Sequence, residues 1–266
     1  MSPAFTELVS RDNPRIRLLS ALANDPRARR EHDQTILDGV HLLESALAAK
    51  IPLLEVCVSI SGCKYKEISE WLTRLPAGLP LVRVPDTVFS GVSPVDTPTG
   101  IVARIQIPPP APVAAEQGGA TIVVLDAIQD PGNVGSILRS AAAAGIGTIW
   151  LTPGCAQAWA PKVLRAGMGA HFRLRLAEQV DVLANLDRYK GKVMATGVGA
   201  ATRSLYDADL RGPLVWLFGA EGQGVSPALM ARADEILTIP LADGIESLNV
   251  GAAATVCLFE QLRQRR

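Results

Sequence analysis

The residues best suited to chemistry lie in three glycine-containing loops, each of which directly follows an apolar stretch. The first stretch, TIVVL, leads into DAIQDPGNVGSILR at residues 126–139. Pro131 suits the first position of a helix, and Asn133 and Ser136 follow it, so that backbone N–H groups at the helix start are free to face a ligand. Arg139 lies within reach of whatever this loop holds. The pattern indicates a bound ligand beside a guanidinium group.

The second loop is LFGAEGQGVS, residues 217–226, after the apolar stretch PLVW. Its three glycines permit backbone conformations closed to other residues and close approach to a ligand. Glu221 is flanked by small residues, where a carboxylate could orient a cation, accept a hydroxyl proton or fix an arginine. A tight connection with a solvated glutamate is the alternative.

The third loop runs through TIPLADGIESLNVGAAATV, residues 238–256. Ser247 and Asn249 precede a helix of small residues, and either residue type ordinarily serves there as an N-cap. Three polar, glycine-containing loops at the ends of apolar strands nevertheless favour one shared site, because ligands of parallel sheets bind beyond the carboxyl ends of the strands.

Helices and strands alternate along the whole chain, which predicts an α/β protein. Residues 107–120, IPPPAPVAAEQGGA, interrupt the alternation with extended proline geometry and flexible glycines. With 266 residues and 48% hydrophobic content, two domains are expected. The proposed division is a domain at 1–106, a linker at 107–120 and a domain at 121–266, the last with a mostly parallel sheet covered on both faces.

Composition excludes several classes of protein. No apolar run reaches the roughly 18 residues of a membrane span, and the first residues resemble no secretory signal, so a cytoplasmic protein is expected. Neither a metal site nor a disulfide framework is indicated by the spacing of the four cysteines and three histidines.

The 26 basic residues equal the 26 acidic ones, which argues mildly against a nucleic-acid partner. Residues 1–30 nevertheless carry six arginines against three acidic residues, either a patch for phosphates or an ordinary solvated face.

Together, NVGSILRSAAAAG, FGAEGQGVS and IPLADGIESLNVGAAA resemble the three motifs of the SpoU (TrmH-like) branch of the SPOUT superfamily, in the family's order. These proteins are RNA 2'-O-ribose methyltransferases that use S-adenosylmethionine, and the resemblance covers residues 121–264. TILDGVHLLESAL and DTPTGIVA resemble the family's ribosomal-protein-like substrate-binding domain. The resemblance implies an α/β protein in which a small substrate-binding domain precedes a parallel-sheet SPOUT domain with a deep trefoil knot. It also implies a homodimer, with the active site close to the subunit contact.

The resemblance further implies roles for individual residues. The cofactor is expected against Thr196, Gly197, Gly219, Ile239 and Leu248. Arg139 is the expected catalytic residue, stabilising the alkoxide that develops as the 2'-hydroxyl attacks the methyl group. Whether Arg139 also takes the proton is left open, since guanidinium is normally always charged. Asn133 and Glu221 would hold the arginine and the ribose, and Ser247 and Asn249 would contact the target nucleotide. Nothing in this chemistry requires a metal.

Two residues depart from the family pattern: Asp38 in LDGV, where glutamate is more frequent, and Gly251, where serine is common.

The leading hypothesis is methylation of ribosomal RNA, with transfer RNA as the nearest alternative substrate and an antibiotic-resistance role left open. A non-catalytic RNA-binding protein of the same fold is the rival from another class. A dinucleotide-dependent dehydrogenase is disfavoured because DPGNVG lacks the glycine fingerprint.

Overall fold

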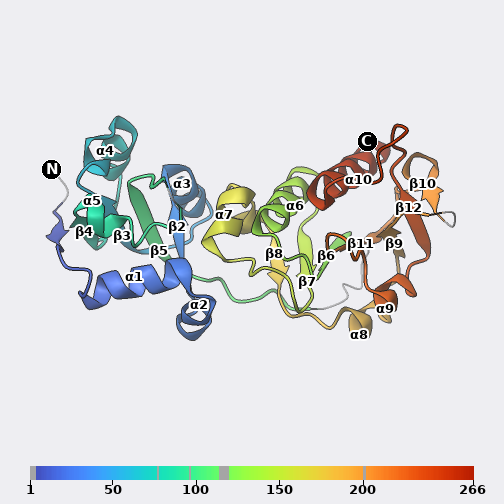
Figure 1. Ribbon diagram of the computed structural model, residues 1–266, viewed down its shortest axis with the longest axis horizontal. Helices are drawn as coiled ribbons and strands as arrows, with labels where there is room; N and C mark the ends of the chain where they lie inside the picture. Colours follow the sequence, from blue (N-terminus) through green and yellow to red (C-terminus); the bar gives the residue numbers. More distant parts are fainter. Residues whose placement is uncertain (1–3, 77, 96, 114–119, 200–201) are drawn as a thin grey trace. The chain divides into compact units, whose positions relative to one another are not determined.

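The computed structural model describes residues 4–76, 78–95, 97–113, 120–199 and 202–266. They form two compact units (Figure 1). The first comprises Met1–Pro109 with Trp159–Phe172, and the second comprises Pro110–Ala158 with Arg173–Arg266. The chain therefore enters the first unit twice. The division at 106 and 121 stays a prediction, and residues 114–119 of the expected linker lie outside the described residues.

The first unit contains a mixed five-stranded sheet in the order β1-β4-β3-β5-β2. β1, β4 and β3 are parallel, whereas β5 runs antiparallel to both β3 and β2. The strands are β1 (Thr6–Glu7), β2 (Gln34–Asp38), β3 (Leu53–Ser59), β4 (Leu81–Val84) and β5 (Ile101–Gln106). The helical segments are α1 (Pro14–Asn24), α2 (Pro26–His32), α3 (Val40–Ala48), η1 (Gly62–Lys64), α4 (Lys66–Leu72), α5 (Asp86–Phe89) and α7 (Pro161–Gly167).

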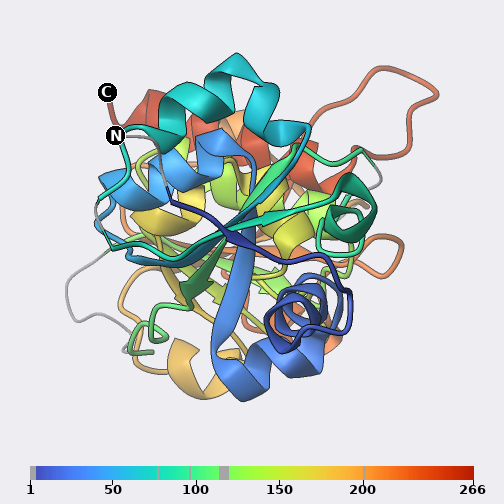
Figure 2. The same ribbon diagram turned by 90° about the vertical axis from the view of Figure 1, so that its left-hand side faces the viewer.

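Helices cover both faces of this sheet. Figures 1 and 2 show α1 and α2 on one face and α3 and α4 on the other. α1 begins after Asn13, whose side chain accepts a hydrogen bond from the Arg15 N–H, and it buries Ile16, Leu19 and Leu22 at helical spacing. These side chains pack on alternate residues of the strands, including Ile36, Cys57, Val82, Val84 and Val102. α7 packs against β2 at the sheet edge.

The second unit contains a seven-stranded sheet in the order β10-β12-β9-β11-β6-β7-β8. Every neighbouring pair is parallel, which confirms the expected sheet and the α/β class. The strands are β6 (Ile122–Asp126), β7 (Thr148–Leu151), β8 (Arg175–Ala177), β9 (Lys192–Thr196), β10 (Arg203–Ser204), β11 (Leu214–Gly219) and β12 (Glu235–Thr238). β6, β7 and β11 are buried along their whole length, as strands covered on both faces must be.

Different helices lie against the two faces of this sheet. α6 (Pro131–Ala143) and α10 (Val250–Gln264) pack side by side (Figure 1). α8 (Val182–Leu186) and α9 (Pro227–Met230) contribute Val182, Leu186 and Leu229 to a separate core with Ile122 and Val124. The deep trefoil knot is a matter of chain threading that strand order alone does not decide, and it stays a prediction. Within the described residues, no helix is both long enough and apolar enough to cross a membrane.

Substitution of Gly62 tests how tightly the first unit is packed around this glycine. A Cβ at this position would collide with the Gly100 carbonyl group, a backbone atom that has little room to move. Gly62→Ala is therefore expected to lower the free energy of unfolding by about 1–3 kcal/mol through overpacking. Gly91→Ala is the matched control, because its Cβ would meet only the Val88 carbonyl oxygen at an ordinary 3.5 Å. Equal melting temperatures for the two variants in calorimetry would contradict this account.

Candidate active site

The loop after β11 folds back tightly on itself. A Cβ at Gly219 would overlap the backbone of Gly224 and Val225. The Gly224 N–H donates to the Ala220 carbonyl oxygen at 2.8 Å, and both Gly222 and Gly224 have positive φ angles, 81° and 70°. Glycine is therefore required at 219 for close approach and favoured at the two turn positions for backbone conformation.

Asp126, at the end of β6, holds this loop in place. Its buried carboxylate accepts a hydrogen bond from the Ser226 N–H at 2.7 Å and one from the Thr152 hydroxyl at 3.1 Å. The loops that follow β6, β7 and β11 are thus tied to one side chain. Asp126 is not among the site residues expected from the sequence, although a carboxylate at the end of an apolar strand is a signal of such a role.

A pocket of about 550 Å³ lies beyond the carboxyl ends of β9, β11 and β12. All five residues expected around the cofactor line it: Thr196, Gly197, Gly219, Ile239 and Leu248. Three of the expected catalytic residues do so as well: Glu221, Ser247 and Asn249. Leu237 and Leu241 add apolar surface that the sequence analysis did not assign. The second and third loops therefore line a single pocket.

Asn133 joins the first loop to the other two through a chain of hydrogen bonds. Its Nδ2 donates to Glu221 Oε1, and its Oδ1 accepts from Asn249 Nδ2 at 2.9 Å. Asn249 Oδ1 in turn accepts from the N–H groups of Gly251 and Ala252, which makes Asn249 the N-cap of α10. Because those backbone groups only donate, the Asn249 amide must face Asn133 with its N–H, and Asn133 must face the Glu221 carboxylate with its own.

Gly251 allows α10 to approach α6 closely. A Cβ there would lie 2.5 Å from Ser136 Oγ and 3.4 Å from Asn133 Oδ1. One helical turn further along each helix, the hydroxyl groups of Ser140 and Thr255 are 2.7 Å apart. In this chain, the departure from the family's serine at 251 therefore has a packing reason.

Arg139 lies apart from these contacts. It follows Asn133 by six residues on α6, which is about 9 Å along the helix axis. The side chain is exposed and is not among the residues that line the pocket. Within the described part of the chain, no hydrogen bond or ion pair involves this guanidinium. The same part contains no cluster of three or more metal-binding side chains.

Comparison with known proteins identifies the family. Residues 120–259 match the SpoU rRNA Methylase family, and residues 13–103 match the MRM3-like substrate binding domain. The chain belongs to the SpoU rRNA methylase family. This confirms the resemblance seen in the three motifs and in the N-terminal segments.

Individual relatives of this SpoU protein extend over nearly its whole length. It is 33% identical, over 98% of its length and 95% of the relative's, to an uncharacterized tRNA/rRNA methyltransferase of Synechocystis sp.. It is 29% identical to the 23S rRNA (guanosine(2553)-2'-O)-methyltransferase of Bacillus subtilis, over 88% of this chain and 90% of the other. A crystal structure of an AdoMet-bound rRNA methyltransferase from Sinorhizobium meliloti superimposes with a TM-score of 0.81 at 26% identity, covering 97% and 98% of the two chains.

Asn249 is expected to contribute to stability as well as to the pocket. Asn249→Ala removes the cap of α10 and is expected to lower the free energy of unfolding by about 0.5–2 kcal/mol. Asn249→Asp keeps the capping acceptor but loses the donor to Asn133, so its melting temperature should fall between those of the wild type and the alanine variant. Calorimetric unfolding measures both.

Ser226→Ala is the matched control for the cap. Ser226 occupies the N-cap position of α9 but makes no side-chain capping bond there. Its substitution should leave the melting temperature unchanged. An Asn249→Ala protein as stable as the Ser226→Ala protein would show that the cap contributes nothing.

Proposed function

We propose that this protein is an S-adenosylmethionine-dependent methyltransferase that methylates the ribose 2'-hydroxyl of a nucleotide in ribosomal RNA. The observation that carries the proposal is the meeting of the three motif loops through Glu221, Asn133 and Asn249 at one pocket. Family membership, the rRNA methyltransferases among the relatives and the AdoMet-bound neighbour support it.

The pocket fits the proposed cofactor. Its volume falls in the range of roughly 300–1,000 Å³ of small-molecule and cofactor sites. Two glycines at its edge are fixed by packing: a Cβ at Gly219 would overlap the backbone of Gly224, and a Cβ at Gly197 would lie 2.9 Å from the Ile236 side chain. Ile239 and Leu248 offer apolar contacts to an adenosine, and Thr196, Gly197 and Gly219 offer polar main-chain edges. S-adenosylmethionine, when bound, supplies a methyl group already activated on a sulfonium centre.

The protein's task is then to activate the ribose hydroxyl, which is a poor nucleophile at neutral pH. We assign charge stabilisation of the developing alkoxide to Arg139, the arginine of the first motif. Glu221 and Asn133 position the ribose and the arginine, while Ser247 and Asn249 contact the target nucleotide. The exposed position of Arg139 leaves its guanidinium available to bound RNA.

A homodimer belongs to the same proposal. Ile245 and Leu248 of the third loop and Phe259 on α10 are large apolar side chains that remain 39–58% exposed in the single chain. A homodimer contact over the third loop would cover Ile245 and Leu248. A second copy seated there would place the active site close to the subunit contact. A cytoplasmic location also stays a prediction.

Ribosomal RNA is preferred over transfer RNA because the first unit carries a separate substrate-binding domain, which suits a large structured RNA recognised by shape and loops. Methyl transfer from labelled S-adenosylmethionine to ribosomal RNA and transfer RNA, each from cells lacking the gene, tests this. If only transfer RNA is labelled, transfer RNA and not ribosomal RNA is the substrate. Heat release on cofactor titration without any labelling of RNA would favour the non-catalytic alternative.

Arg139→Ala tests the catalytic assignment. The variant should bind S-adenosylmethionine as the wild type does, because Arg139 does not line the pocket, but its rate of methyl transfer should fall by about 100-fold or more. Calorimetric titration and label incorporation separate the two effects. Arg188→Ala, which removes another exposed arginine of the second unit, should retain full activity. Turnover of Arg139→Ala at the wild-type rate would refute the assignment.

A further inference from the structure

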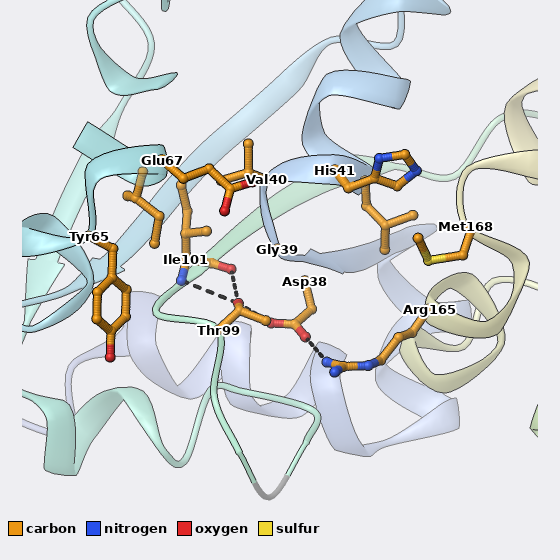
Figure 3. A pocket seen from close by; sticks show the side chains of 12 residues that line it. Asp38, Gly39, Val40, His41, Tyr65, Glu67, Thr99, Ile101, Arg165 and Met168 are labelled. Atoms are coloured by element: carbon orange, nitrogen blue, oxygen red, sulfur yellow. Dashed lines mark hydrogen bonds and ion pairs between the residues drawn. The ribbon is translucent and has the colours of Figure 1, made fainter. Parts of the chain in front are cut away.

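A second cavity, of about 340 Å³, lies in the first unit and has no part in the cofactor site (Figure 3). It is bounded by the start of α3, the start of α4, residues 99–101 and the α7 segment. Figure 3 shows Tyr65 at one end, Arg165 and Met168 at the other, and Thr99 and Asp38 between them. Part of its lining comes from LDGV, the N-terminal motif to which the proposed chemistry assigns no role.

Arg165 is held in a fixed orientation at its end of the cavity. Asp38, whose side chain is only 1% exposed, accepts a hydrogen bond from Arg165 Nη1 at 2.8 Å and one from the Thr99 hydroxyl at 2.8 Å. Burial raises the pKa of the Asp38 carboxyl, and Thr99 and Arg165 act in the opposite direction. The guanidinium carries five N–H groups and remains 49% exposed, so it has donors and an open plane to offer a ligand.

Tyr65 is also positioned by the backbone around it. Gly62 and Gly100 approach so closely that neither has room for a side chain, and Gly100 has a φ of 91°. A Cβ at Gly100 would lie 3.5 Å from Tyr65 Cε2, so one edge of the ring lies near this glycine. Tyr65 as a whole is nevertheless 54% exposed. One edge of the aromatic ring thus lies near a tightly packed backbone, and much of Tyr65 is open to solvent.

We propose that this cavity binds a short unpaired stretch of the RNA substrate, with one base stacked on Tyr65 and a neighbouring nucleotide contacting Arg165. Unpaired bases in RNA are recognised by stacking on aromatic rings and guanidinium planes. Ile68 and Ile101 give the cavity apolar walls, and its volume is that of a small-ligand site. The carboxylates of Asp38 and Glu67 in the lining favour bases over phosphate groups inside it. This inference rests on the proposed function, which supplies RNA as the ligand.

Tyr65→Ala is the decisive variant, because the exposed ring can be removed without opening the core. With total ribosomal RNA from cells lacking the gene as substrate, KM for RNA should rise by about 5- to 150-fold, the loss expected for one base–aromatic stack. The kcat at saturating RNA and the affinity for S-adenosylmethionine should not change. Tyr65→Phe keeps the ring and should retain the wild-type KM. Tyr206→Ala is the matched control, since Tyr206 is 55% exposed in the second unit.

The outcomes separate this inference from the function on which it rests. Failure of the wild type to methylate any RNA would refute both the proposed function and the proposed RNA-binding cavity. A wild type that methylates ribosomal RNA while Tyr65→Ala shows the same KM, or only a lower kcat, would overturn the cavity proposal alone. Photocrosslinking to ribosomal RNA transcribed with 4-thiouridine is an independent readout. Crosslinks should map to the peptide that contains Tyr65, and their absence there would count against the proposal.

Discussion

The hydrogen-bonded chain Glu221–Asn133–Asn249 is the interaction on which the candidate active site depends. Its members are separated by 88 and 116 residues in the sequence, yet each amide group is satisfied by the next residue. These hydrogen bonds form because all strands of the second sheet run parallel, so the loops after the neighbouring strands β6 and β11 meet at the carboxyl ends of the strands. The start of α10, which directly follows the third loop, meets them there. Loss of Asn133 would break both links at once, because Asn133 bonds to Glu221 and to Asn249.

The site and the fold of the second unit share the same residues. Asn249 caps α10 and also faces the pocket, Asp126 ends a buried strand and also holds the β11 loop, and Gly251 permits the contact between α6 and α10. Gly251 lets the two helices approach closely. Asn249 accepts hydrogen bonds from backbone N–H groups at the start of α10, and Asp126 accepts one from the Ser226 N–H. Substitution of Asn249 is therefore expected to change both the stability of α10 and the lining of the pocket.

Under the proposed function, the two units bind different ligands. The second unit holds a pocket with apolar walls and glycine-rich edges, which suits a small cofactor. The first unit has a cavity in which a buried carboxylate fixes an exposed guanidinium and two glycines support an aromatic ring, which suits unpaired bases. Arg165 reaches the first unit because Trp159–Phe172 packs with it, although in sequence this segment lies between β7 and β8 of the second unit.

Local pattern determined much of this protein. Apolar patterns and turn residues predicted the alternation of helices and strands and the parallel α/β sheet of the second unit, because these depend on neighbours a few residues apart. The three motifs pointed to the family and to residues that line the pocket of the second unit. Tertiary structure alone decided that Asn133 links Glu221 to Asn249, that Asp126 anchors the β11 loop, that Arg139 lies outside the pocket, and that Arg165 pairs with Asp38 across 127 residues. Such contacts depend on where the folded chain returns, and no periodicity within a single segment encodes that return.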